Sequence, residues 1–363
     1  MPDELVHPVI VIPCFNEASV LRATCQSLGF GTGGADQPAH ATLIIVDNGS
    51  TDETPAIARK IQRDSRAGSV IVGYERERGY VPPRRAGNFL ARDFARATGL
   101  EPSEILLLQA DADTRYAGGY VEAMRQAASL AGADVLLEGL AEYAVDAHLG
   151  LYLRLMAATD ERVFSRLGIP ETHEFVCTDA VSAYRLGDYF TWGGHQREFD
   201  ATGEEILAET TRLRIRSLRW GGRKTKVESA VAFPSERKVL LRGAEEFATA
   251  GFPRGEQWRA AWRRSYNGPE SAAEFAAVPD DPEVIRCIKT RERHVLALFG
   301  LLPVHAVRTA GGTPPPADLE LLSIASLLPA RDAAVLSRHP GLLISDVLDI
   351  VDHRPDELNQ FLA

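Results

Sequence analysis

Short runs of apolar residues alternate with amphipathic stretches over roughly the first 140 residues of the chain. Residues 9–12, 43–46, 70–72 and 105–108 are continuous apolar runs, which is the pattern of strands buried on both faces. Residues 18–28, 53–65 and 84–98 between them have helical periodicity. This alternation predicts an α/β fold in which helices flank a mixed, mostly parallel sheet.

The second half of the chain is less regular and then becomes helical. Residues 227–233 predict a last strand, and the helical pattern covers 256–265, 282–302, 317–328 and 332–349. We therefore expect a domain boundary at about residue 240. Residues 1–240 would form an α/β domain, and residues 241–363 would form a helical C-terminal extension.

Polar residues follow three of the predicted strands. Asp111 and Asp113 come directly after 105–108, and Asp47 with Asn48 follows 43–46. Because open α/β sheets bind ligands at the carboxyl ends of their strands, these side chains should share one edge. Two carboxylates on one turn repel each other, and a divalent cation that also binds substrate phosphates relieves the repulsion. The pattern predicts a cation-assisted phosphate site.

Arg84 and Arg85 stand where the helix of residues 84–98 is expected to begin. Cations at a helix N-terminus oppose the helix dipole, so a solvated helix start explains them less well than an anionic partner does. A diphosphate is such a partner, because arginine binds phosphate oxygens through paired hydrogen bonds.

Composition narrows the class of protein. The net charge of −10 argues against a nucleic-acid partner, which would require a basic face. The four cysteines lack both C-x-x-C spacing and the density of a disulfide scaffold, so we expect buried free thiols in a reducing cytosol. The N-terminal residues lack the basic region of a signal peptide, and no apolar stretch is long enough to span a bilayer. We expect a soluble cytoplasmic chain without a transmembrane segment, and contact with a membrane surface remains open.

Three segments carry a family resemblance. Residues 11–17 (VIPCFNE), 45–52 (IVDNGSTD) and 111–113 (DAD) resemble the ordered signatures of family 2 glycosyltransferases. Residues 79–91 resemble the arginine-bearing segment of the same family, so the likeness covers roughly residues 8–130. It implies a type A glycosyltransferase fold, with residues 1–140 as the nucleotide-sugar half of the catalytic domain and residues 141–240 as the acceptor half.

The resemblance also implies the chemistry. Family members transfer a sugar from a nucleotide diphosphate sugar to an acceptor hydroxyl, with inversion at the anomeric carbon. The cation, Mn²⁺ or Mg²⁺, would be held by Asp113 together with Asp111. Arg237 lies in a segment that resembles the closing serine-arginine element of the family. The implied donor-binding residues are Pro13, Phe15, Asn16, Glu17, Asp47, Asn48, Arg84, Arg85, Asp111, Ala112, Asp113 and Arg237.

Residues 182–185, 193–194 and 203–206 resemble the acceptor side of the family pattern. By position Glu205 is the implied general base, with Glu204 and Asp200 as alternatives. We expect a helix from these glutamates to about Ser217. A helix start stabilises the charged form of a carboxylate, which suits a general base.

Arginines crowd the second part of this expected helix. Arg212, Arg214 and Arg216 suit either a solvated basic face or contact with a charged acceptor. The sequence pattern leaves both readings open.

The pair Asp47-Asn48 departs from the two adjacent aspartates of many relatives. A carboxylate accepts the N–H of uracil, whereas an amide could serve uracil or guanine. UDP is favoured as the nucleotide, and GDP stays open. A retaining glycosyltransferase, a nucleotidyltransferase and a non-catalytic nucleotide-sugar-binding protein are the alternative functions. The acceptor hydroxyl, whether of a glycan, a lipid-linked molecule or a small molecule, is unknown.

Overall fold

The computed structural model describes residues 6–32, 41–143, 149–169, 174–249, 251–314 and 319–363. The chain falls into two compact units. Unit 1 comprises Met1–Tyr143, Cys177–Arg197 and Glu209–Ser235, and unit 2 comprises Ala144–Val176, Glu198–Ala208 and Glu236–Ala363. The expected boundary at residue 240 lies close to the last change of unit. Unit 2 additionally takes two segments from the part expected to form the acceptor half.

Unit 1 is built on a sheet with strand order β3-β2-β1-β4-β7-β6-β8-β5. The four runs expected as strands are β1 to β4, and they are mutually parallel. β7 runs antiparallel to β4 and to β6, so the sheet is mixed but mostly parallel, as expected. The strands are β1 (His7–Cys14), β2 (Thr42–Asp47), β3 (Val70–Tyr74), β4 (Ile105–Gln109), β5 (Arg115–Tyr116), β6 (Val135–Ala141), β7 (Ser182–Arg185) and β8 (Arg223–Phe233).

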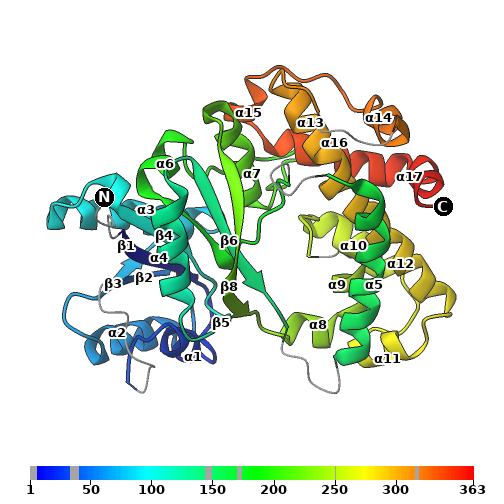
Figure 1. Cartoon of the computed structure of the whole chain (residues 1–363). Helices are drawn as coiled ribbons and strands as arrows, with labels where there is room; N and C mark the ends of the chain where they lie inside the picture. Colours follow the sequence, from blue (N-terminus) through cyan, green and yellow to red (C-terminus); the bar gives the residue numbers. More distant parts are fainter. Residues whose placement is uncertain (1–5, 33–40, 144–148, 170–173, 250, 315–318) are drawn as a thin grey trace. The chain divides into compact units, whose positions relative to one another are not determined.

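Helices cover both faces of this sheet. The α-helices of unit 1 are α1 (Leu21–Ser27), α2 (Thr54–Asp64), α3 (Val81–Thr98), α4 (Tyr120–Ala131), α6 (Leu186–Thr191) and α7 (Glu209–Ser217), and short 3-10 helices lie at Pro102–Glu104, Asp179–Val181 and Leu218–Trp220. Side chains alternate along each strand, so Ile10 packs with α1, α2 and α4, whereas Val9 packs with α3, α6 and α7. In Figure 1, α1 and α2 lie below β1, β2 and β3, and α3 lies above them.

Unit 2 is helical in its described part, and the helical C-terminal portion was expected. Its elements are α5 (Gly150–Leu167), α8 (Arg237–Leu241), α9 (Gly243–Thr249), α10 (Glu256–Ser265), α11 (Ala272–Ala277), α12 (Pro282–Val295), a π-helix (Leu296–Leu301), α13 (Leu302–Thr309), α14 (Leu319–Ala325), α15 (Val335–Arg338), α16 (Gly341–His353) and α17 (Pro355–Leu362). Buried Arg291 on α12 donates hydrogen bonds of 2.6 and 2.5 Å to the carboxylate of Asp160 on α5, which joins the first helix of unit 2 to the extension.

The single helix expected over residues 332–349 is wrong. The chain forms α15 and then α16, with His339 and Pro340 between them. Proline lacks the backbone N–H that a helix interior requires, and its ring collides with the preceding turn. Pro340 therefore ends the first helix and precedes the second.

Of the two readings left open for the arginines of α7, the solvated basic face is wrong. Arg212, Arg214 and Arg216 are each only 1% exposed. Arg212 and Arg216 donate hydrogen bonds to the backbone carbonyls of Gln196 and Gly194, at 2.8 and 2.9 Å. Burial lowers the pKa of Arg214 to about 10. These arginines hold loops of unit 1 in place.

Candidate functional site

The loops that follow β1 and β2 are bonded to each other. Asn16 has a left-handed backbone (φ 56°), and its N–H donates to Ser50 Oγ at 3.0 Å. The Thr51 N–H donates to Asn16 Oδ1 at 2.8 Å, and the Glu17 N–H donates to Thr54 Oγ1 at 2.8 Å. Two of the expected signature segments thus form one continuous edge at the carboxyl ends of these parallel strands.

Asp47 and Asn48 are both buried at this edge. Asp47 Oδ1 accepts the Ser50 N–H at 3.1 Å. The Asn48 amide donates both hydrogens to backbone carbonyls, to Glu75 at 3.0 Å and to Glu77 at 2.7 Å. The amide hydrogens of Asn48 are therefore already engaged, and a base contact at this pair would use an acceptor oxygen of Asp47 or Asn48.

Arg78 belongs to the same edge and was missed from the sequence. Its guanidinium donates to the carbonyls of Asn48 and Gly49, both at 2.6 Å, and lies 4.2 Å from the ring centre of Phe15. Phe15 is 50% exposed. Arg78 follows β3, and this position after a third parallel strand was the available signal. An exposed aromatic ring beside a cation is a surface on which a nucleobase could stack.

Asp111 and Asp113 stand on the turn after β4, as expected. The Asp111 N–H donates to the Tyr116 hydroxyl at 3.1 Å, and Ala112 O accepts the Thr24 hydroxyl at 2.7 Å. The Asp111 side chain is 39% exposed, and Asp113 is half-buried. Backbone bonds therefore fix the turn while its carboxylates stay accessible.

Arg84 joins this turn to the start of α7. Its side chain is 5% exposed, forms an ion pair with Asp111, and donates from Nε to Glu209 Oε1 at 3.1 Å. Burial alone would lower the pKa of Arg84, but Asp111, Asp179 and Glu209 outweigh it and raise the pKa. Burial, with Glu209 nearby, raises the pKa of Asp179 to about 7. Two carboxylates, Asp111 and Glu209, share one guanidinium, which leaves the cluster with excess negative charge.

A chain of buried polar groups lies beside the carboxylates that surround Arg84. Gln109 Nε2 donates to Asn88 Oδ1 at 3.0 Å, and the Asn88 amide lies 3.5 Å from His195 Nδ1. His195 Nε2 lies 3.4 Å from the Thr210 hydroxyl. Burial, together with Arg84 nearby, lowers the pKa of His195 well below its usual value, so the imidazole stays neutral. The network connects the end of β4 with α3 and α7.

Arg85 lies apart from this cluster. Its guanidinium donates to Glu77 at 3.2 Å, and the same carboxylate accepts from Arg197 at 2.8 Å. The contact of Arg85 with diphosphate stays a prediction.

The base candidates Asp200, Glu204 and Glu205 all belong to unit 2. The helix expected to begin at the glutamates is wrong, because α7 begins at Glu209. Glu205 instead pairs with Phe199 in an isolated β-bridge. Ala208, directly before the helix, has a left-handed backbone (φ 62°), which interrupts helical geometry there. Arg237, at the start of α8, is exposed and also belongs to unit 2.

Two of these three carboxylates bind backbone N–H groups. Asp200 Oδ1 accepts from Thr202 and Glu204, at 2.8 and 2.9 Å. Partial burial opposes the charged form, yet these bonds hold the pKa of Asp200 below its usual value, which makes it a weaker base. Glu204 Oε1 accepts the Gln257 N–H at 3.3 Å. Glu205 keeps its place as the predicted base.

Glu209 was missed from the sequence. It is 6% exposed, it is the first residue of α7, and it shares Arg84 with Asp111. The expectation of a carboxylate at a helix start applies to Glu209. The sequence signal for Glu209 was that it is a third glutamate, four residues after Glu205, and that the helical pattern could begin there.

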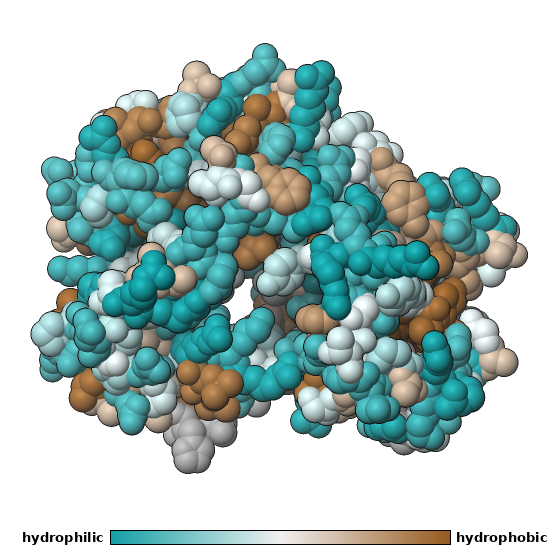
Figure 2. Space-filling view, turned by 180° about the vertical axis from the view of Figure 1, so that it is seen from behind, coloured by the Kyte–Doolittle hydropathy of each residue, from teal (hydrophilic) through white to brown (hydrophobic). Residues whose placement is uncertain are grey.

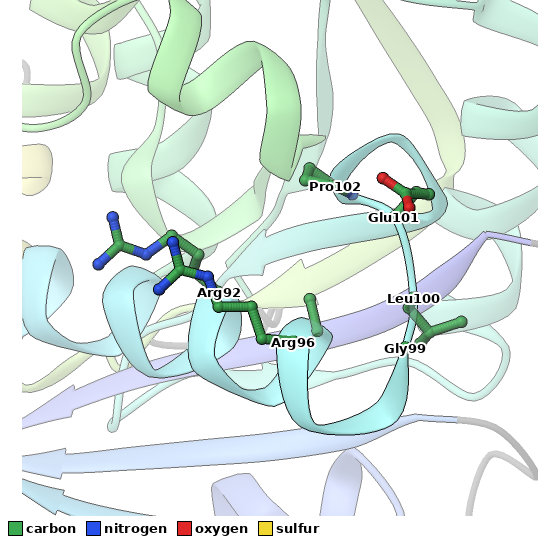
Figure 3. Close-up of a pocket in the computed structure, with 7 residues that line it drawn as sticks. Arg92, Arg96, Gly99, Leu100, Glu101 and Pro102 are labelled. Carbon is green, nitrogen blue, oxygen red and sulfur yellow. The ribbon is translucent and has the colours of Figure 1, made fainter.

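A cavity of about 430 Å³ lies elsewhere in unit 1, at the C-terminal end of α3 (Figure 3). It is lined by Arg92, Ala95, Arg96, Gly99, Leu100, Glu101 and Pro102. None of the expected site residues lines it, and Arg84 stands in the first turn of the same helix. The cavity is separate from the strand-end site.

No three His, Cys, Asp or Glu side chains form a metal-binding group within the described ranges. Asp111 and Asp113 nevertheless suit a hard cation that takes its remaining oxygen ligands from phosphates and water. The excess negative charge around Arg84 fits a divalent cation. Arg84 Nη1 is buried and has no hydrogen-bond partner among the described residues.

Residues 9–144 match the family model described as Glycosyl transferase family 2, so this part of the chain is a domain of that glycosyltransferase family. The resemblance inferred from the three signature segments is confirmed. A search of the curated proteins finds no match.

Three solved structures resemble the chain at low identity. A mannosyltransferase from Pyrobaculum calidifontis, in complex with GDP-Man and Mn²⁺, is 15% identical with a TM-score of 0.45, over 98% of this chain and 90% of that one. S. aureus TarS 1-349 in complex with UDP is 11% identical with a TM-score of 0.43, over 98% and 92%. GalNAc-T7 with UDP, GalNAc and Mn²⁺ is 14% identical with a TM-score of 0.41, over 63% and 44%.

Two observations concern contact with a membrane. Within the described ranges, no helix has both the length and the apolar character needed to cross a bilayer. Figure 2 shows one face of the molecule as mostly hydrophilic, with hydrophobic side chains in small separate groups. The four cysteines are buried and free, as expected.

Proposed function

We propose that this chain transfers a sugar from a nucleotide diphosphate sugar to an acceptor hydroxyl with inversion at the anomeric carbon. The observation that carries the proposal is the turn of Asp111 and Asp113 after β4, which leaves accessible carboxylates at the carboxyl end of a parallel sheet. Phe15 and Asp47 stand after neighbouring strands at the same edge, where a nucleoside can bind.

Asp113 and Asp111 would hold Mn²⁺ or Mg²⁺. When bound, the cation supplies Lewis-acid neutralisation of the diphosphate leaving group. Arg84 fixes one carboxylate of the pair. The ion pair and the backbone bonds hold the turn before a donor binds, and electrostatic stabilisation is strongest when the charged groups are preorganised in this way.

Inversion in one step needs one base, on the face opposite the leaving diphosphate. Glu205 is the predicted base, and Glu209 is a second candidate because it lies at a helix start beside the Asp111–Arg84 pair. The base must stay ionised, and the N-terminus of α7 favours the charged carboxylate of Glu209.

Paired amide variants separate the two glutamates. The true base, replaced by glutamine, should keep donor binding and lose about 10²- to 10⁴-fold in turnover, because general base catalysis contributes that much. The other variant should keep most of its turnover. Near-native turnover in both Glu205→Gln and Glu209→Gln would remove both residues from the role.

UDP is the proposed nucleotide. The Asn48 amide hydrogens are engaged with backbone carbonyls, so a base contact at this pair would be made by an acceptor oxygen, and the carboxylate of Asp47 suits the N–H of uracil. Competitive binding of UDP against GDP with Mn²⁺ present tests this. A clear preference for GDP would overturn the assignment and leave the cation site as argued.

A thermal-shift panel of nucleotide sugars, with and without Mn²⁺, tests the function as a whole. A ligand that binds only the folded chain raises the melting temperature. We expect a Mn²⁺-dependent rise with one nucleotide sugar, followed by transfer that leaves an inverted product. A retained anomeric configuration would contradict the inverting mechanism. The absence of any Mn²⁺-dependent shift would contradict the donor site.

A further inference from the structure

Segment 198–208 belongs to a different unit from the chain on either side of it. Residues 177–197 and 209–235 lie in unit 1, whereas 198–208 lies in unit 2 with the C-terminal extension. The segment carries Asp200, Glu204 and Glu205. Its contacts within unit 2 therefore decide how the predicted base is held.

The first contact is between Glu198 and α16. Glu198 is 2% exposed, and its Oε2 accepts the Gly341 N–H at 2.6 Å. His339 Nδ1 lies 3.5 Å from the same oxygen. Gly341 is the first residue of α16, whose N-cap residue Pro340 makes no side-chain cap. Glu198 therefore supplies the cap from a distant part of the chain, where a helix N-terminus favours negative charge.

The second contact is between Glu204 and α10. Gly255 is the N-cap residue of α10 and has no side chain, and the Gln257 N–H in its first turn donates to Glu204 Oε1 at 3.3 Å. The two carboxylates of one segment thus cap two different helices of the extension. The backbone between Glu198 and Glu204 is short and is held by hydrogen bonds within the segment.

Backbone bonds make the segment a small hairpin. The Asp200 N–H donates to Glu204 O at 2.9 Å, and the Ile206 N–H donates to Glu198 O at 2.8 Å. Asp200 Oδ1 also accepts the Thr202 N–H, which closes the turn. Glu205 lies between these hydrogen-bonded residues, so a displacement of Glu198 or Glu204 would also displace Glu205.

We propose that α10 and α16 of the C-terminal extension position the base-bearing segment 198–208, with Glu198 and Glu204 as positioning residues. The inference rests on the proposed function, since it takes the base to be on this segment. It gives the extension a part in turnover that is separate from donor binding, because the expected cation ligands belong to unit 1.

Gly341→Ala tests the first contact. A Cβ at Gly341 would lie 2.7 Å from Glu198 Oε2 and 2.9 Å from Ile206 Cδ1. The Glu198 and Ile206 side chains must move, and the Glu198 cap of α16 is broken. We expect a loss of about 10- to 10²-fold in kcat at saturating donor and acceptor, because small misplacements of catalytic groups are costly. The affinity for UDP with Mn²⁺, measured by calorimetry, should not change.

Gly255→Ala tests the second contact independently, because its Cβ would lie 2.4 Å from the Glu204 carboxylate. Gly187→Ala on α6 is the matched control, since an added methyl there meets its nearest atoms at 3.8 Å. The control should keep native kcat. Hydrogen exchange at the Asp200 and Ile206 amides should become faster in both test variants and stay native in the control.

The exchange measurement separates failure of the inference from failure of the proposed function. Native exchange in both test variants would overturn the anchoring, whether or not the chain transfers sugar. Faster exchange with native kcat would overturn the catalytic role of the anchoring. A wild-type chain without transferase activity would overturn the proposed function, and the catalytic role with it, while faster exchange would still support the anchoring.

Discussion

Two groups of acidic residues, one in each unit, serve different purposes. In unit 1, Asp111 and Glu209 share the buried guanidinium of Arg84, and Asp179 lies close enough to raise its pKa further. In unit 2, Glu198 and Glu204 bind backbone N–H groups at helix N-termini. Carboxylates that outnumber their cation leave negative charge for a ligand, whereas carboxylates bonded to N–H groups fix the course of the chain.

The largest expected effect is on stability, at Arg84. Arg84→Met removes the cation and leaves Glu209 buried without a partner. Breaking a buried pair by removing one member costs about 3–5 kcal/mol. We expect the free energy of unfolding, measured in urea, to fall by that amount.

The matched control for Arg84 is Arg96→Met on the same helix. Its side chain is 70% exposed and pairs with Asp93 at 3.8 Å. Exposed pairs contribute about 0.2–1 kcal/mol, so this variant should be close to wild type. Equal losses in the two variants would show that Arg84 is not a buried ion-pair centre.

A smaller effect is expected at Glu204. Glu204→Ala removes the cap of α10 and should lower the free energy of unfolding by about 0.5–2 kcal/mol. Glu204→Gln keeps an oxygen that can accept the Gln257 N–H, so it should retain most of this stability. If denaturant unfolding shows the glutamine variant as unstable as the alanine variant, the hydrogen bond is not the source of the stabilisation.

The smallest effect is expected for Asn16→Gly, in the loop after β1. Asn16→Gly keeps the left-handed backbone and loses the acceptor for Thr51, which should cost about 0.5–1.5 kcal/mol. Asn16→Ala should cost roughly 1 kcal/mol more, because an alanine side chain disfavours that backbone. Thermal unfolding of the two variants checks the difference. An alanine variant as stable as the glycine variant would contradict the role given to the backbone.

The sequence predicts β1, β2 and β4 well because these strands are buried on both faces. Residues 9–12 and 105–108 are continuous apolar runs that lie inside β1 and β4. The same logic places Asp111 and Asp113 at a strand end. A buried parallel strand leaves few alternatives for the residues that follow it.

The partners of these residues could not be predicted in the same way. Arg84 and Glu209 are 125 positions apart, and no local pattern encodes such a pairing. Three arginines on α7 are typical of a solvated face, but backbone carbonyls surround them instead. The break at Pro340, in contrast, was readable from the chemistry of proline.

The most direct test of the account is titration calorimetry of UDP with and without Mn²⁺, on the wild-type chain and on Asp113→Ala. We expect the wild type to bind UDP tightly only with Mn²⁺, and Asp113→Ala to lose the Mn²⁺ dependence while its melting temperature stays native. Asp93→Ala, at an exposed position of α3, is the control and should bind like wild type. Mn²⁺-dependent binding of UDP or GDP by Asp113→Ala at wild-type affinity would contradict the assignment of the cation site.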